Sequence, residues 1–396
     1  MDDVSRLQDW FSSGLLLKPD AGRPGSVHLS RALAALCGAP LTLDAPERDV
    51  AAAIGESPHY VFVLADGLGM NLIEALPPQS FLRKHLAMEL AATFPSSTAP
   101  ALTSIATGLW PSEHGLPAWL VYLPDQDLHT VTLPFIERFS SRPLKELGVS
   151  SRQLFVAPPL WAALQRDAAL FMHHRIADSV YTRYISGGHP VVSYDNLDGA
   201  IDAVTLRIED ATGATFSYLY YSAIDTAAHI SGPGSPAVAA EVRKLDGGIE
   251  ALSDALGDRA RILVSADHGG YDVSPDQKLV IEPEEELSQL LLTPPAGEAP
   301  VPMFHVRPGK RAEFAARFRA RAGDAYVLLT VEEVEDLRLL GPEPLSETTR
   351  VRLGDFVALS AGGEAVVYAP ETSVVDMKGF HGGLTPAEVR IPLVVA

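Results

Sequence analysis

Three aspartates and three histidines are candidate metal ligands, and one threonine is a candidate nucleophile. These residues are Asp66, Thr98, Asp225, His229, Asp267, His268 and His381. Carboxylate and imidazole groups together suit borderline divalent ions such as zinc. Six such ligands and a hydroxyl suffice for two ions about 4 Å apart, the separation used in two-metal phosphoryl transfer. We therefore expect two divalent ions, with Zn²⁺ as the expected metal.

The local spacing of the ligands supports this expectation. Asp225 and His229 are four residues apart, so one helical turn places them on the same face, where they can grip one cation together. Asp267 and His268 are adjacent and are followed by two glycines, which allow the backbone to turn tightly. For Asp66, which is followed by a glycine, an ordinary turn is an equally good interpretation until the other ligands are considered.

Thr98 ends a cluster of hydroxyl residues that precedes a predicted helix. Pro100 suits the first helical turn because it has no N–H to donate. A threonine here has its hydroxyl and backbone N–H at the positive end of the helix dipole, where a phosphate-like anion binds. Taken alone, the stretch favours a simple N-cap role for Thr98. The aspartates and histidines elsewhere in the chain favour the nucleophile.

Buried strands must bring these residues to one edge of a sheet. Tyr60–Ala65 and Arg261–Ala266 are continuous apolar runs, typical of strands buried on both faces, and each leads into candidate ligands. In open α/β sheets, ligands bind at the carboxyl ends of the strands. From residue 116 to 215, short strands such as Leu154–Val156 alternate with helical pieces. This alternation predicts a mainly parallel sheet.

The pattern of strands and helices divides the chain into three predicted parts. Residues 1–57 are expected to be an N-terminal extension packed on the core. Residues 58–272 and 379–396 are expected to form the metal-binding α/β core. Residues 273–378 are rich in Pro and Glu and no longer alternate between strand and helix patterns, which predicts a small α+β insert near the site.

Composition excludes several function classes. The chain has 31 Lys and Arg against 50 Asp and Glu, a net charge of −19, which disfavours binding to nucleic-acid polymers or anionic membranes. Bound metal ions can still reverse the local sign for a phosphate substrate. The single cysteine, Cys37, excludes a Cys-rich zinc site. No signal peptide or membrane span is recognised, so a cytoplasmic location is expected.

The ordered set of motifs resembles the alkaline phosphatase superfamily, and within it the type I phosphodiesterase/nucleotide pyrophosphatase family. The resemblance runs from Tyr60 to the C-terminus. Its motifs are Asp66-Gly67, Thr98 before Thr107-Gly-Leu-Trp-Pro-Ser-Glu-His-Gly115, Asp225-x-x-x-His229, Asp267-His268-Gly269 and Gly379-x-His381-Gly382. It implies an alkaline-phosphatase-like three-layer sandwich with a mainly parallel central sheet and a small α+β insert.

The resemblance also implies the roles of the site residues. One ion would be held by Asp225, His229 and His381, and the other by Asp66, Asp267, His268 and the Thr98 oxygen. Thr98, rather than Thr93, would be the nucleophile because it stands nine positions before Thr107, the spacing that the family shows. Attack on phosphorus would form a phospho-threonine, which water then hydrolyses.

The motifs are compatible with several functions. The first is a phosphodiesterase or nucleotide pyrophosphatase acting on a small-molecule phosphate ester, such as a nucleotide. The alternative within enzymes is a phosphomonoesterase, or a phosphonate or sulfate ester hydrolase, using the same metals. No Lys or Arg lies near Thr98 in the sequence to neutralise a dianionic phosphate, which favours the monoanionic diester. A non-catalytic zinc-binding protein is the remaining alternative, but it would have no need of Thr98.

Overall fold

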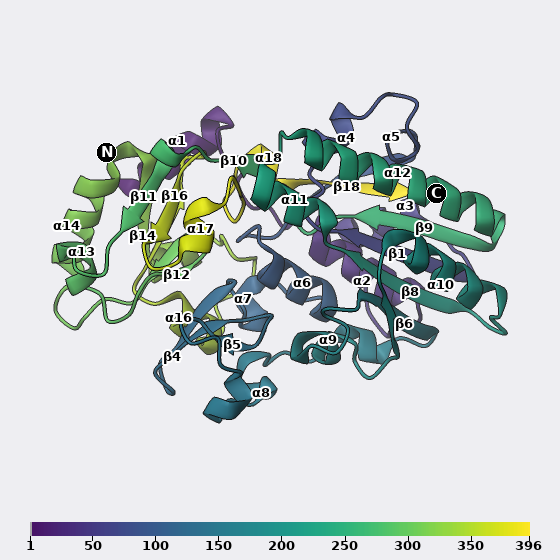
Figure 1. Ribbon diagram of the computed structural model, residues 1–396, viewed down its shortest axis with the longest axis horizontal. Helices are drawn as coiled ribbons and strands as arrows, with labels where there is room; N and C mark the ends of the chain where they lie inside the picture. The colour runs from purple at the N-terminus through teal and green to yellow at the C-terminus, as the bar shows by residue number, and fades with distance from the viewer. Residues whose placement is uncertain (1) are drawn as a thin grey trace.

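The computed structural model describes residues 2–396 and contains two seven-stranded sheets (Figure 1). In the central sheet, the five neighbouring strands β9, β1, β8, β6 and β7 are parallel, whereas β18 is antiparallel to both of its neighbours. In spatial order its strands are β2 (Leu86–Ala91), β18 (Arg390–Val395), β9 (Ala260–Ser265), β1 (His59–Ala65), β8 (Thr215–Tyr221), β6 (Asp167–His173) and β7 (Val191–Tyr194). The predicted mainly parallel α/β sheet is confirmed.

Helices cover both faces of the central sheet, which gives the expected three layers (Figure 1). On one face, α2 (Ser26–Leu36) packs against α3 (Ala45–Ile54) and α6 (Thr98–Thr107). On the other, α12 (Pro236–Leu256) packs against α10 (Leu197–Glu209) and α11 (Ala223–Ser231). The buried residues of α12 recur every three or four positions, as an amphipathic helix requires. The sequence therefore dictates which side of each helix meets the sheet.

The second sheet is antiparallel throughout and combines segments that are far apart in the chain. In spatial order its strands are β14 (Tyr326–Thr330), β15 (Phe356–Ser360), β13 (Pro302–Phe304), β12 (Ala296–Gly297), β3 (Leu120–Leu123), β4 (Leu128–Val131) and β5 (Ile136–Glu137). The parallel βα alternation expected from residue 116 onward is wrong for residues 120–137. The short turn between β3 and β4 closes a hairpin, which can join only antiparallel strands.

The second sheet shares a core with the central one. Along β14, Tyr326 and Leu328 pack into a smaller apolar cluster, while Val327 and Leu329 belong to the main cluster. Successive side chains of a strand point to opposite faces, so this sheet is buried on both sides. Residues 273–378 therefore pack on the rest of the chain through a large apolar face. The division into an extension, a core and an insert stays a prediction.

One predicted strand is absent: a short helix ends at its first residue, and the next two residues lie in no helix or strand. Leu154–Val156 was expected to be a strand, but residues 151–154 form α8 (Ser151–Leu154). Ser150 and Gln153 form a capping box at its start, with the Ser150 N–H donating to Gln153 Oε1 at 2.8 Å. This local signal for a helix start outweighs the apolar run that follows.

Short elements complete the chain. Two-stranded pairs are formed by β10 (Tyr271–Asp272) with β17 (Gly379–Phe380), and by β11 (Lys278–Ile281) with β16 (Ala365–Tyr368). The other α-helices are α1 (Asp3–Ser13), α4 (Met70–Ala75), α5 (Phe81–Lys84), α7 (Pro111–His114), α9 (Val180–Ile185), α13 (Glu286–Gln289), α14 (Arg311–Ala322), α15 (Val331–Asp336), α16 (Glu347–Leu353), α17 (Thr372–Asp376) and α18 (Pro386–Val389). The 3-10 turns are η1 (Leu144–Leu147), η2 (Leu160–Ala163), η3 (Gly257–Arg259), η4 (Pro275–Gln277) and η5 (Gly323–Ala325). Within residues 2–396, no helix combines the length and apolar character that crossing a bilayer needs.

Phe304→Ala should test the smaller apolar cluster. Phe304 is fully buried, and its ring packs 4.9 Å from that of Phe314 and 5.1 Å from that of Phe318. Removing the ring should lower the free energy of unfolding by about 3–5 kcal/mol, measured by urea denaturation. The control Leu292→Ala, at a side chain that is 50% exposed, should change it by less than about 0.5 kcal/mol. Equal effects of the two substitutions would contradict this packing.

Candidate metal centre

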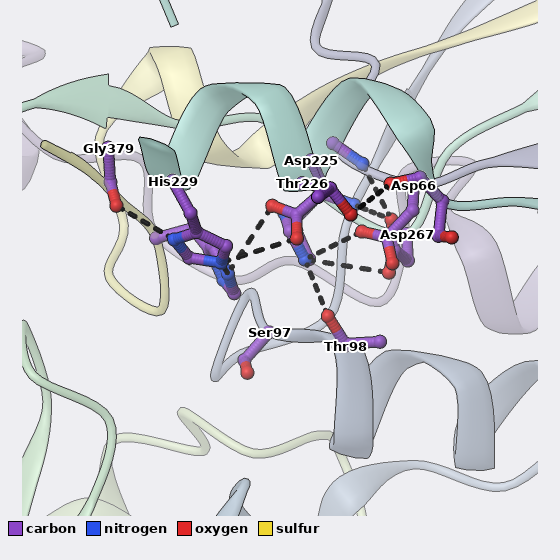
Figure 2. A network of polar contacts seen from close by, with 12 residues as sticks. Asp66, Ser97, Thr98, Asp225, Thr226, His229, Asp267 and Gly379 are labelled. Atoms are coloured by element: carbon purple, nitrogen blue, oxygen red, sulfur yellow. Dashed lines mark hydrogen bonds and ion pairs between the residues drawn. The ribbon is translucent and has the colours of Figure 1, made fainter. Parts of the chain in front are cut away.

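All seven predicted site residues meet at the carboxyl edge of the central sheet. Figure 2 labels Asp66, Thr98, Asp225, His229 and Asp267 among them. β1 lies between β8 and β9, so the segments that follow these three strands are neighbours in space. They supply Asp66 after β1, Asp225 and His229 on α11 after β8, and Asp267 and His268 after β9. The pairing of β10 with β17 places His381, which follows β17, beside them. Thr98 is the first residue of α6.

Asp225, His229 and His381 form one group. Asp225 Oδ2 lies 3.2 Å from His229 Nε2, and Asp225 Oδ1 lies 3.8 Å from His381 Nε2. The two imidazole Nε2 atoms are 3.3 Å apart. The spacing of Asp225 and His229 on α11 thus puts both side chains on one face, as predicted from their four-residue separation.

Asp66, Asp267, His268 and Thr98 form a second group beside the first. His268 Nε2 lies 3.5 Å from Asp66 Oδ1, 3.5 Å from Asp267 Oδ2 and 3.1 Å from Thr98 Oγ1. The rings of His268 and His381 stack with their centroids 3.7 Å apart, which joins the two groups. The site is therefore one continuous cluster of donor atoms.

The three histidines all turn the same ring nitrogen toward this cluster. Their Nδ1 atoms face backbone carbonyl oxygens: His229 that of Gly379 at 2.9 Å, His268 that of Gly269 at 2.9 Å and His381 that of Ser96 at 3.2 Å. A nitrogen facing a carbonyl carries the proton, so the lone pair of each neutral ring is on Nε2. This is how proteins orient metal-binding imidazoles.

Each buried carboxylate of the second group has one oxygen satisfied by the protein and one left over. Asp66 Oδ2 accepts from the Tyr220 hydroxyl, and Asp267 Oδ1 accepts from the N–H groups of Gly67 and His268. Asp66 Oδ1 and Asp267 Oδ2 are buried and have no hydrogen-bond partner among the described residues. Such orphaned oxygens are costly unless a cation or a donor meets them. This donor set fits a divalent ion.

The electrostatics of the site lead to the same conclusion. Burial raises the pKa of Asp66 well above its usual range, and the charges of Asp267 and Asp225 raise it further. Burial also raises the pKa of Asp267. Burial alone would lower the pKa of His229, but the Asp225 carboxylate raises it to about 9. The carboxylates therefore require positive charge beside them, which either a proton or a metal ion can supply.

The start of α6 aims the Thr98 hydroxyl at the cluster. The N-cap residue is Ser97, so the interpretation of Thr98 as the cap is wrong. The Ser97 hydroxyl donates to Glu298 Oε1 at 2.6 Å instead of capping the helix. The first helical hydrogen bond runs from the Ala101 N–H to the Ser97 carbonyl at 3.0 Å. The N–H groups that precede it lie at the positive end of the helix, beside the ligands.

A cavity of about 630 Å³ opens beside the cluster, between the central sheet and the second sheet. Thr98, His229 and His381 line it, together with Glu298 from the loop after β12 and Arg175 from the loop after β6. No sequence pattern indicated Glu298 or Arg175. Glu298 stands in an irregular Pro- and Glu-rich segment that carries no local signal. Burial raises its pKa to about 7, although hydrogen bonds from Ser97 and Trp119 oppose the rise.

Tyr220 is a further residue that the sequence analysis missed. Its neighbour Tyr221 points to the other face of β8, where its hydroxyl donates to Glu241 Oε2 at 2.7 Å. Because side chains alternate between the faces of a strand, Tyr220 reaches Asp66 and orients it, whereas Tyr221 does not. The period of two along β8 was the signal that could have found Tyr220.

Tyr220→Phe should weaken zinc binding by about 10–100-fold, because Asp66 loses the donor that orients it. Competition with a chromogenic chelator would measure the affinity. The matched control, Tyr221→Phe, removes the same atom on the opposite face of β8 and should leave zinc affinity within about threefold of wild type. An equal loss in both variants would show that the effect is not specific to Asp66.

Comparisons with known proteins identify similar folds and a family. A similar solved structure is the murine ectonucleotide pyrophosphatase/phosphodiesterase 5, as an inactive variant in complex with AMP, at 18% identity and a TM-score of 0.63, covering 84% of this chain and 87% of that chain. Phosphonoacetate hydrolase from Sinorhizobium meliloti 1021, in complex with phosphonoformate, is similar at 20% identity and a TM-score of 0.61, covering 85% of this chain and 89% of that chain. At these identities the likeness concerns the fold.

Curated proteins gave no match in sequence. The family model described as type I phosphodiesterase/nucleotide pyrophosphatase matches residues 60–384, which span most of the 396 residues and include every residue of the cluster. The chain belongs to the type I phosphodiesterase/nucleotide pyrophosphatase family.

Proposed function

We propose that this protein is a two-metal hydrolase of phosphate diesters, of the phosphodiesterase/nucleotide pyrophosphatase type, and that Thr98 is its nucleophile. The observation that carries the proposal is the position of Thr98 Oγ1, 3.1 Å from His268 Nε2 inside the ligand cluster. Family membership supports a phosphoester hydrolase in general. The diester preference and the phospho-threonine intermediate are the more specific part of the proposal.

The two groups of donor atoms would each hold one divalent ion, with zinc as the expected metal. Asp225, His229 and His381 would hold one ion. Asp66, Asp267, His268 and the Thr98 oxygen would hold the other, and the orphaned oxygens of Asp66 and Asp267 support this assignment. When bound, the ions supply Lewis acidity, which lowers the pKa of the attacking hydroxyl and stabilises the leaving oxygen.

The chain's own groups then carry out a double displacement. Thr98 Oγ1 forms a bond to phosphorus as its proton passes to solvent water, and the bond from phosphorus to the leaving oxygen breaks, with water protonating that oxygen. The free N–H groups at the start of α6 would donate to the phosphoryl oxygens, where charge accumulates. A water molecule next attacks phosphorus, the bond to Oγ1 breaks, and Thr98 regains a proton.

The cavity suggests the substrate class. Its volume of about 630 Å³ is in the range of small-molecule sites, and apolar and aromatic side chains such as Trp119, Tyr181 and Phe380 make up much of its lining. Among the described lining residues, Arg175 is the only Lys or Arg. We infer a small phosphate ester with an apolar or aromatic leaving group, and a nucleotide is one candidate. A nucleic-acid polymer is not expected, given the net charge of −19.

Zinc-loaded protein should hydrolyse bis-p-nitrophenyl phosphate with a higher kcat/KM than p-nitrophenyl phosphate. The physical reason is the lack of a Lys or Arg beside Thr98 that would neutralise the second charge of a monoester. Release of p-nitrophenol measures both rates, and chelation of the metal should abolish both. A preference for the monoester would make the protein a phosphomonoesterase. Zinc retention without turnover of either ester would favour a non-catalytic zinc-binding protein.

Thr98→Ala should reduce turnover of bis-p-nitrophenyl phosphate at least about a thousandfold, because the nucleophile is gone, while zinc content stays nearly intact. Zinc is measured by atomic absorption on the same samples. Thr107→Ala makes the same change at the other end of α6, where the hydroxyl donates to the Thr103 carbonyl at 2.7 Å and accepts from the Leu109 N–H at 3.3 Å, both away from the ligand cluster. This control should keep most of its turnover. Unchanged rates in Thr98→Ala would remove Thr98 from its role.

A further inference from the structure

We propose that Glu298 is a specificity-determining residue, which makes the site select phosphate esters of single negative charge over dianionic phosphomonoesters. The inference rests on the proposed phosphate-ester function. The metal ligands alone do not explain a preference for one ester class over the other. We attribute that preference to Glu298, which follows β12 of the second sheet.

Glu298 contacts two segments that carry site residues, the segment before Thr98 and the segment after His381. Its carboxylate accepts from the hydroxyl of Ser97, the residue before Thr98. Its stem packs against Gly382, the residue after His381: a Cβ added to Gly382 would lie 2.8 Å from Glu298 Cβ and 3.0 Å from its Cγ. Glu298 and Thr98 also line the same cavity, so the carboxylate belongs to the space that a substrate of Thr98 would enter.

Two hydrogen bonds hold the carboxylate in position. Ser97 Oγ donates to Oε1 at 2.6 Å, and the Trp119 N–H donates to the same oxygen at 2.7 Å. The other oxygen, Oε2, makes no hydrogen bond to the described residues, and the side chain lines the cavity that opens beside Thr98. The two anchors prevent the side chain from turning away to solvent, so its charge stays beside the substrate.

A fixed carboxylate acts differently on the two ester classes. A diester carries one negative charge, whereas a monoester above its second pKa of about 6 carries two. Coulomb repulsion scales with the product of the charges, so the monoester is repelled about twice as strongly. Arg175, the one Lys or Arg among the described lining residues, is exposed, and solvent screens its charge. The positive charge that faces Glu298 belongs to the ligand cluster, where His229 and His268 lower the pKa of Glu298. That charge attracts both ester classes, so the repulsion by Glu298 still acts more strongly on the dianion.

Glu298→Gln tests the proposal because glutamine keeps the shape and can still accept both hydrogen bonds at one oxygen. Assays run at pH 8.5, above the pKa of about 7 of Glu298, so that the wild-type carboxylate is charged. The kcat/KM for p-nitrophenyl phosphate divided by that for bis-p-nitrophenyl phosphate should rise about tenfold or more. A ratio within threefold of wild type, in a variant with the wild-type Tm, would overturn the proposal.

Glu364→Gln is the matched control. Glu364 likewise accepts from a serine hydroxyl, that of Ser360, at 2.8 Å, but it does not line the cavity. Its substitution should leave the ratio unchanged, and an equal rise in both variants would reject a specific role for Glu298. Glu298→Met is a second uncharged variant, in case glutamine perturbs folding. If both Glu298 variants unfold, the residue is a structural link and the proposal fails.

Ligand binding separates this proposal from the proposed function. Titration calorimetry of methyl phosphate and dimethyl phosphate into zinc-loaded protein at pH 8.5 needs no turnover. Glu298→Gln should bind methyl phosphate about tenfold more tightly than wild type and dimethyl phosphate with a smaller change. If the wild type hydrolyses neither ester, the proposed function fails and this measurement still decides the role of Glu298. Equal changes for both ligands, or no binding of either, would overturn it.

Discussion

The requirement to compensate three carboxylates at one edge of a sheet, two of them buried and the third partly buried, governs this structure. Asp66, Asp225 and Asp267 lie on adjacent segments because β1 is the neighbour of both β8 and β9. Burial makes their charges costly, and the surrounding groups are arranged to relieve that cost. Backbone amides and one tyrosine hydroxyl donate to one oxygen of Asp66 and one of Asp267, and the remaining oxygen of each has no hydrogen-bond partner among the described residues. The three imidazoles turn their lone pairs to the same place, so a cation there would meet both kinds of ligand.

The glycines of the Asp-His-Gly-Gly motif follow from the same requirement. Asp267 and His268 can face the cluster only if the chain after them passes close to other backbone. A Cβ added to Gly269 would lie 2.0 Å from the Ala387 carbonyl oxygen and 2.9 Å from Gly69 Cα. No side chain fits at such a distance, so the residue that follows His268 must be glycine. The motif thus has a packing cause as well as a chemical one.

The sequence predicts the site better than it predicts the architecture around it. Local patterns identify β1 and β9, and the residues that follow these strands are the ones that meet in space. Pairing between residues 120–137 and 296–360 depends on contacts across long stretches of chain, which leave no local periodicity to read. The strand predicted at Leu154–Val156 failed because a capping box starts a helix there. Glu298 lies in an irregular loop, and only the tertiary structure shows its partner Ser97.

The second sheet packs against the first through a shared apolar cluster, and this packing gives the side chains that it supports a defined place beside the cavity. Its inner face, with residues such as Val327 and Val357, belongs to the same apolar cluster as the strands that carry the ligands. A carboxylate supported in this way keeps its distance from Thr98, whereas an exposed side chain such as Arg175 does not. A fixed charge discriminates between substrates because its distance from each of them is set by the protein. A mobile charge can move toward one substrate and away from the other, so it discriminates less. Differences in selectivity among proteins with these ligands should therefore originate in what the second sheet presents to the cavity.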